Sequence, residues 1–259
     1  MSYPVFSQGI PEPVRDRGKY ELRFARTPAE LEAVQRLRFE VFNLELGEGF
    51  EESYGTGLDR DRFDPICHHL MVNDIEADKL VGTYRIQSYE MAIAHEGFYS
   101  GDEVDLGGLT EEVLRQSVEV GRASVALEYR NQKVLFLLWR GLAAYMSQNE
   151  KRYLFGCCSL TSQDPQEGRR VMEFLRRKGY CHAELSVSPR PEWRCYEEVE
   201  SDQFPAEELK LPKLFRTYLR YGAKVCGPPA LDRHFKTIDY LVLLDTAELD
   251  RVTRALFFR

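Results

Sequence analysis

The segment Ser117–Leu127 constrains the fold more than any other part of the chain. Its apolar and polar residues alternate, which predicts a strand with two different faces. Gly121 interrupts the alternation, and a glycine inside a strand indicates a β-bulge or a close backbone approach. A bulge releases a backbone N–H that could stabilise an oxyanion, and Glu119 is a candidate base nearby. The structural alternative is an ion pair between Glu119 and Arg122 at a sheet edge.

The elements expected around this strand indicate one α/β domain with a mixed sheet. Strands are expected at 20–25, 69–72, 80–88, 153–159 and 238–244, and helices at 28–41, 131–148, 164–178 and 213–221. The second and third strands form a hairpin, whereas helices connect most of the others. Residues 1–18 are expected to be a flexible lead-in, 19–259 the domain, and 188–212 an insertion within it. Residues 47–65 are expected to form a long loop, which is often functional.

Composition and charge exclude several classes of protein. The 259 residues carry a formal net charge of −7, which argues against nucleic acid as a partner. Apolar runs such as Val134–Trp139 are far shorter than the roughly 20 residues that span a bilayer. The first 17 residues lack the apolar core of a signal peptide. We therefore expect a cytoplasmic protein, at most peripheral to the inner face of a membrane.

The cysteines and histidines do not predict a metal site. None of the six cysteines is spaced as CxxC, so neither a zinc site nor a disulfide framework is indicated. Cys67, His68 and His69 are consecutive, but neighbouring residues of a strand point to opposite faces. We expect no metal.

Nine short segments, taken in order, resemble a known family. They are Arg38–Phe42 with Glu45–Gly47, Asp59–Asp64 followed by His68–Leu70, Val81–Arg85, Glu119–Arg122, Leu138–Gly141, Phe155–Ser159 and Cys226–Ala230. In this combination the chain resembles the ornithine-lipid N-acyltransferases, also called hemolysin-like acyltransferases. That family has the GNAT fold and is related to acyl-homoserine-lactone synthases and N-acyl amino acid synthases. The resemblance covers about residues 20 to 245.

The resemblance implies a single GNAT-like domain with a splayed central sheet flanked by helices. It implies transfer of a (3-hydroxy)fatty acyl group from acyl-carrier protein to the α-amine of an amino acid such as ornithine, the first step of an aminolipid. The donor would be the acyl-phosphopantetheine of the carrier, with no permanently bound cofactor. The corresponding site positions are Arg38, Glu45, Asp61, Asp64 and Arg85 for substrate binding, and Glu119 and Arg122 for catalysis. The expected bulge adds Gly121 to the catalytic candidates.

The chemistry of amide formation supports these residue types. An amine attacks a thioester only as the free base, and its pKa in water is near 10, so a proton acceptor must lie close to the nitrogen. Glu119 is the candidate, because partial burial raises the pKa of a carboxyl group. Acids of the 59–64 loop could hold a cationic acceptor. Arg85 and Arg122 either bind a carboxylate in a bidentate manner or brace those acids.

One segment departs from most GNAT enzymes and bears on the donor. Those enzymes hold the coenzyme A pyrophosphate on a glycine-rich loop at a helix start. Here the corresponding residues 130–135 contain no glycine, which favours a carrier protein as donor. Carrier proteins are acidic, so a basic docking surface is expected, and a solvated charged face is the alternative. The candidates for this surface are Arg130, Lys133, Arg169, Arg170, Arg176, Arg177 and Lys178.

Three other functions stay open at this point. One is an acyl-homoserine-lactone-type synthase that uses S-adenosylmethionine, and another is a long-chain N-acyl amino acid synthase. The third, from a different class, is a non-catalytic acyl-binding protein on a GNAT scaffold, which the presence of Glu119, Arg85 and Arg122 disfavours.

Overall fold

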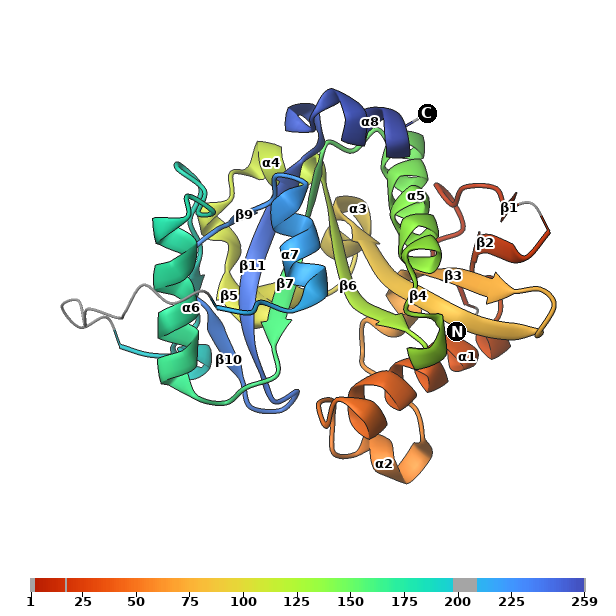
Figure 1. Cartoon of the computed structure of the whole chain (residues 1–259), viewed down its shortest axis with the longest axis horizontal. Coiled ribbons are helices and arrows are strands. Elements are labelled where there is room, and N and C mark those ends of the chain that lie inside the picture. Colours follow the sequence, from red (N-terminus) through yellow and green to blue (C-terminus); the bar gives the residue numbers. More distant parts are fainter. Residues whose placement is uncertain (1–2, 17, 198–208, 259) are drawn as a thin grey trace.

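The computed structural model describes residues 3–16, 18–197 and 209–258, and a central sheet runs through it (Figure 1). The strand order is β1-β2-β3-β4-β6-β7-β11-β10, with β9 paired to β11. All these pairs are antiparallel except β6 with β7, so the sheet is mixed. The strands are β1 Val14–Asp16, β2 Tyr20–Phe24, β3 His68–Asp74, β4 Lys79–Ser88, β6 Ser117–Val125, β7 Tyr153–Leu160, β9 Lys224–Val225, β10 Ala230–Asp232 and β11 Thr237–Asp245. Two short strands, β5 Val104–Asp105 and β8 Ser188–Pro189, pair apart from this sheet.

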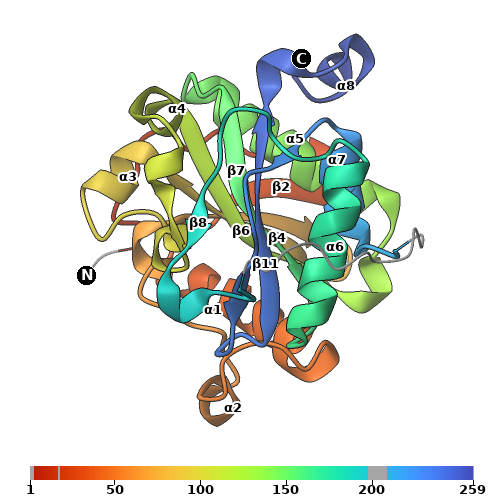
Figure 2. The ribbon, with the colours of Figure 1, turned by 90° about the vertical axis from the view of Figure 1, so that its left-hand side faces the viewer.

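Helices cover both faces of the sheet. Figure 2 shows α6 and α7 on one side of β11, and α3, α4 and β8 on the other. The helices are α1 Pro28–Phe39, α2 Ser53–Thr56, α3 Tyr89–Ile93, α4 Glu111–Arg115, α5 Gln132–Gln148, α6 Pro165–Arg177, α7 Lys213–Arg220 and α8 Arg251–Phe257. Side chains of α5, α6 and α7 join one large apolar core. The opposite face carries a second, smaller core.

Local signals place the helix starts where the sequence predicts them. Thr27 and Glu30 form a reciprocal capping box at the start of α1, and Asn131 caps α5 with its side chain. The first helix differs from the expected continuous stripe, because residues Glu40–Glu45 continue it as a π-helix. A π-helical turn contains more residues than an α-helical one, so it rotates the residues that follow.

The sheet splays between β6 and β7, as predicted. The two strands pair only where Ser117–Glu119 lies beside Tyr153–Phe155. Beyond that point β6 contains a bulge, because Gly121 opposes Arg85 and Ser124 opposes Thr83. The left-handed backbone conformation belongs to Arg122, with φ of 52°, and not to Gly121. The prediction of a bulge is therefore confirmed, one residue later than expected. The predicted single GNAT-like domain with a mixed, splayed sheet is the observed architecture.

Three expected segments differ from the structure in detail. The described part of the lead-in is not loose, since Tyr3 and Ile10 are buried and β1 pairs with β2. The long loop at 47–65 contains the single turn α2. The 188–212 insertion contains β8 and a 3-10 turn, and its residues 198–208 lie outside the described residues. In the described part of the chain, no helix has both the length and the apolarity required to cross a bilayer.

Candidate active site

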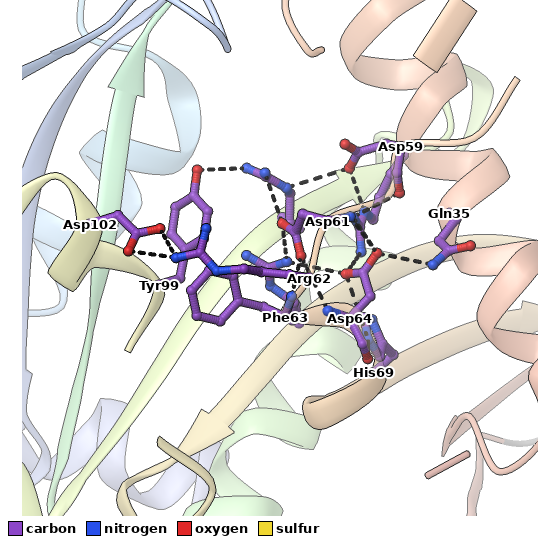
Figure 3. Close-up of polar contacts among 12 residues, drawn as sticks. Gln35, Asp59, Asp61, Arg62, Phe63, Asp64, His69, Tyr99 and Asp102 are labelled. Atoms are coloured by element: carbon purple, nitrogen blue, oxygen red, sulfur yellow. Dashed lines mark hydrogen bonds and ion pairs between the residues drawn. The ribbon is translucent and has the colours of Figure 1, made fainter. Parts of the chain in front are cut away.

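Arg38 is the centre of a buried ion cluster beside the splay. The side chain is fully buried in the last turn of α1. Its Nε donates to the Asp59 carboxylate at 2.6 Å, and its Nη1 donates to Asp64 at 2.7 Å. Asp64 also accepts from Gln35, while its backbone carbonyl accepts from His69, as Figure 3 shows. The long loop thus closes over α1 through charged hydrogen bonds.

Arg85 and Arg122 complete this cluster from the sheet. Arg85, on β4, donates to both Asp61 and Asp64. Arg122, at the bulge of β6, donates to Asp61 at 3.1 Å and lies 3.5 Å from Asp59. Of the two roles considered for these arginines, the contacts favour bracing the loop acids over binding a free carboxylate.

The protonation states agree with a permanently ionised cluster. Burial by itself raises the pKa of Asp61, but Arg85 and Arg122 outweigh it and hold the pKa well below its usual range. Burial also acts against ionisation of Asp64, yet Arg38 and Arg85 lower its pKa as well. Such groups stay charged throughout the neutral range.

Glu119 is buried and faces the splay. Its two carboxylate oxygens accept the backbone N–H groups of Tyr99 at 2.7 Å and Ser100 at 2.8 Å. Burial raises its pKa, and these hydrogen bonds limit the increase. The ion pair with Arg122, considered from the sequence as the structural alternative, is wrong, because Arg122 is engaged by Asp59 and Asp61 instead. Glu119 is therefore positioned by the loop before β5 and remains available as a proton acceptor.

A cavity of about 450 Å³ occupies the splay. Glu119, Gly121 and Arg122 line one wall, and Cys157 and Ser159 of β7 line the other. A Cβ added to Gly121 would meet no atom within 4 Å, so this glycine leaves the space beside Glu119 open.

The cavity is apolar on one face of the sheet and polar on the other. On the side of α5 and α7 it is lined by side chains of the large core, which include Tyr84, Val120, Leu138, Phe215 and Tyr218. Glu119 lies between Val118 and Val120, which join that core, so its own side chain points to the opposite face. The gap between β6 and β7 thus connects an apolar compartment with a polar one.

Three acids of the polar compartment were not predicted from the sequence. Glu103, Asp232 and Asp239 line the cavity, and oxygens of the three carboxylates lie within 4.8 Å of one another. Burial raises the pKa of Glu103 well above its usual value, and the neighbouring acids add to this shift. Burial, together with nearby acids, raises the pKa of Asp239 to about 7.

This acid cluster leads to a stability prediction. Between about pH 4 and 7 folded Asp239 keeps a proton that the unfolded chain has lost, so the free energy of unfolding falls as pH rises through this window. Asp239→Asn cannot ionise, and we expect it to be more stable than the wild type at pH 8 by about 2–4 kcal/mol. Urea unfolding at pH 4 and pH 8 measures the effect, with Asp102→Asn at an exposed ion pair with Arg62 as the control. Equal stability of D239N and wild type at pH 8 would contradict it.

Two groups of residues predicted from the sequence lie outside the ion cluster around Arg38. Glu45 instead forms a bidentate ion pair with Arg130. Arg176 and Arg177 lie in the last turn of α6, about 18 Å along the helix from its start near the end of β7. Figure 1 shows α5 and α6 on separated parts of the sheet. The seven basic residues considered as a docking surface thus lie on or beside two helices, α5 and α6, and their role in docking stays a prediction.

Neither the histidines nor Cys157 provides another reactive site. His68 contacts Tyr145, and His69 contacts the Asp64 carbonyl, so the two rings point to opposite faces as predicted. Burial raises the pKa of the Cys157 thiol well above its usual value, which keeps it protonated. Within the described ranges, the potential metal ligands that lie close enough together to share an ion are the carboxylates of Glu103, Asp232 and Asp239.

Comparison with known proteins identifies the family. The family model "Acetyltransferase (GNAT) domain" matches residues 37–140. The L-ornithine N(alpha)-acyltransferase of Agrobacterium fabrum is 33% identical over 246 residues, with 90% of this chain and 83% of the relative covered. That of Rhizobium meliloti is 34% identical over 243 residues, with 88% and 81% covered. The chain belongs to the L-ornithine N(alpha)-acyltransferase family. It is thus an acyltransferase enzyme, and the non-catalytic alternative is wrong.

A solved structure supports the fold alone. The CoA-dependent acyl-homoserine lactone synthase BjaI, solved with SAM and isopentyl-CoA, aligns with a TM-score of 0.50 and 13% identity. The alignment covers 89% of this chain and 81% of that one. At this identity the likeness extends to the GNAT architecture and not to the substrates.

Proposed function

We propose that the enzyme transfers a (3-hydroxy)fatty acyl group from acyl-carrier protein to the α-amine of L-ornithine, as the first step of an aminolipid. The observation that carries the proposal is the two-sided cavity at the splay, apolar toward Leu138 and acidic toward Glu119. An acyl chain suits the apolar side, and a cationic amino acid suits the acidic side. The names of the relatives from Agrobacterium fabrum and Rhizobium meliloti support ornithine as acceptor.

The residues suggest a direct transfer without an acyl-enzyme. Glu119 takes a proton from the α-ammonium, and the neutral amine attacks the thioester carbonyl carbon. As the C–N bond forms, the carbonyl oxygen gains charge, which backbone N–H groups at the bulge after Gly121 stabilise. The C–S bond then breaks, the attacking nitrogen loses its second proton, and the leaving pantetheine thiolate takes up that proton to become the free thiol.

The start of α5 supports a carrier protein over coenzyme A as donor. Asn131 Oδ1 accepts the backbone N–H groups of Lys133 and Val134, both at 3.0 Å. In a pyrophosphate-binding GNAT site these amides would face the phosphates. Here the side chain of Asn131 already occupies them. This arrangement favours a donor whose pantetheine is attached to a carrier protein, because such a donor does not depend on a pyrophosphate site at the start of α5.

The donor prediction can be tested by charge reversal near the splay. Lys133→Glu, at the exposed start of α5, is expected to raise KM for acyl-carrier protein several-fold, most strongly at low salt. Arg115→Glu is the matched control. Arg115 is exposed on α4, beside the first residues of β6 and away from the start of α5, so this variant should leave KM unchanged. Mass spectrometry of the products with 3-hydroxyacyl carrier protein or acyl-CoA and a panel of amines measures both donor and acceptor. Equal turnover with free acyl-CoA, unaffected by K133E, would contradict the proposal.

A further inference from the structure

The acid cluster of Glu103, Asp232 and Asp239 is assembled from distant parts of the chain. Glu103 precedes β5, Asp232 ends β10, and Asp239 lies on β11. The relative exposures of the three are 1%, 1% and 5%. All three line the polar compartment of the cavity, on the same face as Glu119. Three carboxylates so close together repel one another unless a positive group lies between them.

The described part of the chain does not supply that positive group. None of the ion pairs between described residues includes these three carboxylates, and the nearby Arg122 is committed to Asp59 and Asp61. One cluster oxygen, Asp239 Oδ1, is buried without any hydrogen-bond partner. The buried Gln87 Oε1, which belongs to another cavity-lining residue, has no partner either. These orphaned acceptors independently indicate a ligand that donates hydrogen bonds.

We propose that Glu103, Asp232 and Asp239 bind the side-chain ammonium of a basic amino acid acceptor. This inference rests on the proposed function and names the part of the site that recognises the acceptor. An ammonium group offers three donors and a positive charge, which match the free acceptor positions of the cluster. Asp232 is held rigid for this task, because its Oδ1 accepts the backbone N–H groups of His234 and Phe235.

The cluster also explains how one of two amines is selected. Carboxylates around the side-chain amine keep it protonated, and a protonated amine is not a nucleophile. The α-amine is then left near Glu119, which accepts its proton. Acylation is thereby directed to the α-nitrogen, while the terminal nitrogen keeps its charge.

The test compares L-ornithine with L-norvaline, which has the same carbon chain and lacks the terminal ammonium. For the wild type we expect kcat/KM to favour ornithine by at least about 30-fold. Asp239→Asn and Glu103→Gln should each reduce this ratio about 10- to 100-fold, mainly through KM for ornithine. Asp102→Asn, next to Glu103 but paired with the exposed Arg62, is the control and should keep the ratio. Calorimetric titration of each amino acid without donor gives a second readout that needs no turnover.

The outcomes separate this inference from the proposed function. Equal kcat/KM and equal binding of ornithine and norvaline by the wild type would overturn the ammonium pocket and leave N-acylation intact. Absence of acyl transfer to every amine, with binding of ornithine stronger than that of norvaline, would overturn the proposed function alone. Loss of the ornithine preference on treatment with EDTA would assign the cluster to a metal and overturn the inference.

Discussion

Arg38→Met is expected to lower the free energy of unfolding by about 3–5 kcal/mol. The substitution leaves Asp59 and Asp64 buried without the guanidinium that holds both of them. Since a domain is typically stable by only about 5–15 kcal/mol, the loss is a large share of the total. Urea unfolding followed by circular dichroism measures it as a lower midpoint.

Arg36→Met is the matched control on the same helix. Arg36 forms an exposed i,i+4 ion pair with Glu32, and such pairs contribute at most about 1 kcal/mol. The expected difference between the two variants therefore exceeds about 2 kcal/mol. If R38M does not fold, the triple variant with Asp59→Asn and Asp64→Asn should recover soluble protein, because it removes the uncompensated charges. Similar losses for R38M and R36M would show that the cluster contributes no more than a surface pair.

Glu119→Gln is expected to lower kcat by about 10²–10⁴ at neutral pH, because the proton acceptor for the α-amine is removed. The raised pKa of Glu119 means that wild-type activity increases with pH as this carboxyl group ionises. Activity of the variant should continue to rise at higher pH, where more of the amine is already free. The defect should therefore shrink with increasing pH.

The pH profile separates catalysis from a merely structural role. Glu119 also fastens the backbone at Tyr99 and Ser100, so a structural defect would lower the melting temperature and reduce the rate by a constant factor at every pH. Glu128→Gln, at an exposed pair with Lys79, is the control and should change neither. A near-normal rate of E119Q at pH 7 would place the base elsewhere, and not at Asp64, because Arg38 and Arg85 hold that carboxylate and lower its pKa.

Much of the fold was predictable because its signals are local. The capping box of Thr27 and Glu30 involves residues three apart, and the alternation around Gly121 predicts both a strand and its bulge. The resemblance to a family correctly grouped Arg38, Asp64 and Arg85, which the structure brings into one cluster. Asp59 of the same loop also binds Arg38, but its sequence position offered no reason to choose it as a site residue beside Asp61 and Asp64.

Long-range pairing decided the rest of the site. Glu45 is seven residues from Arg38, a spacing that would share a face in an α-helix, yet the π-helical turn between them rotates it toward Arg130. Glu103 and Asp239 are separated by more than a hundred residues and belong to no common motif, so only the tertiary structure reveals their proximity. The sequence by itself determined the helix starts and the bulged strand, through interactions among near neighbours. The contacts of the ion cluster join residues as far apart as Arg122 and Asp61, and the resemblance to a family, not a local signal, indicated its members. The tertiary structure alone decided which acids meet in the cavity, because that depends on strand order and register across the whole sheet.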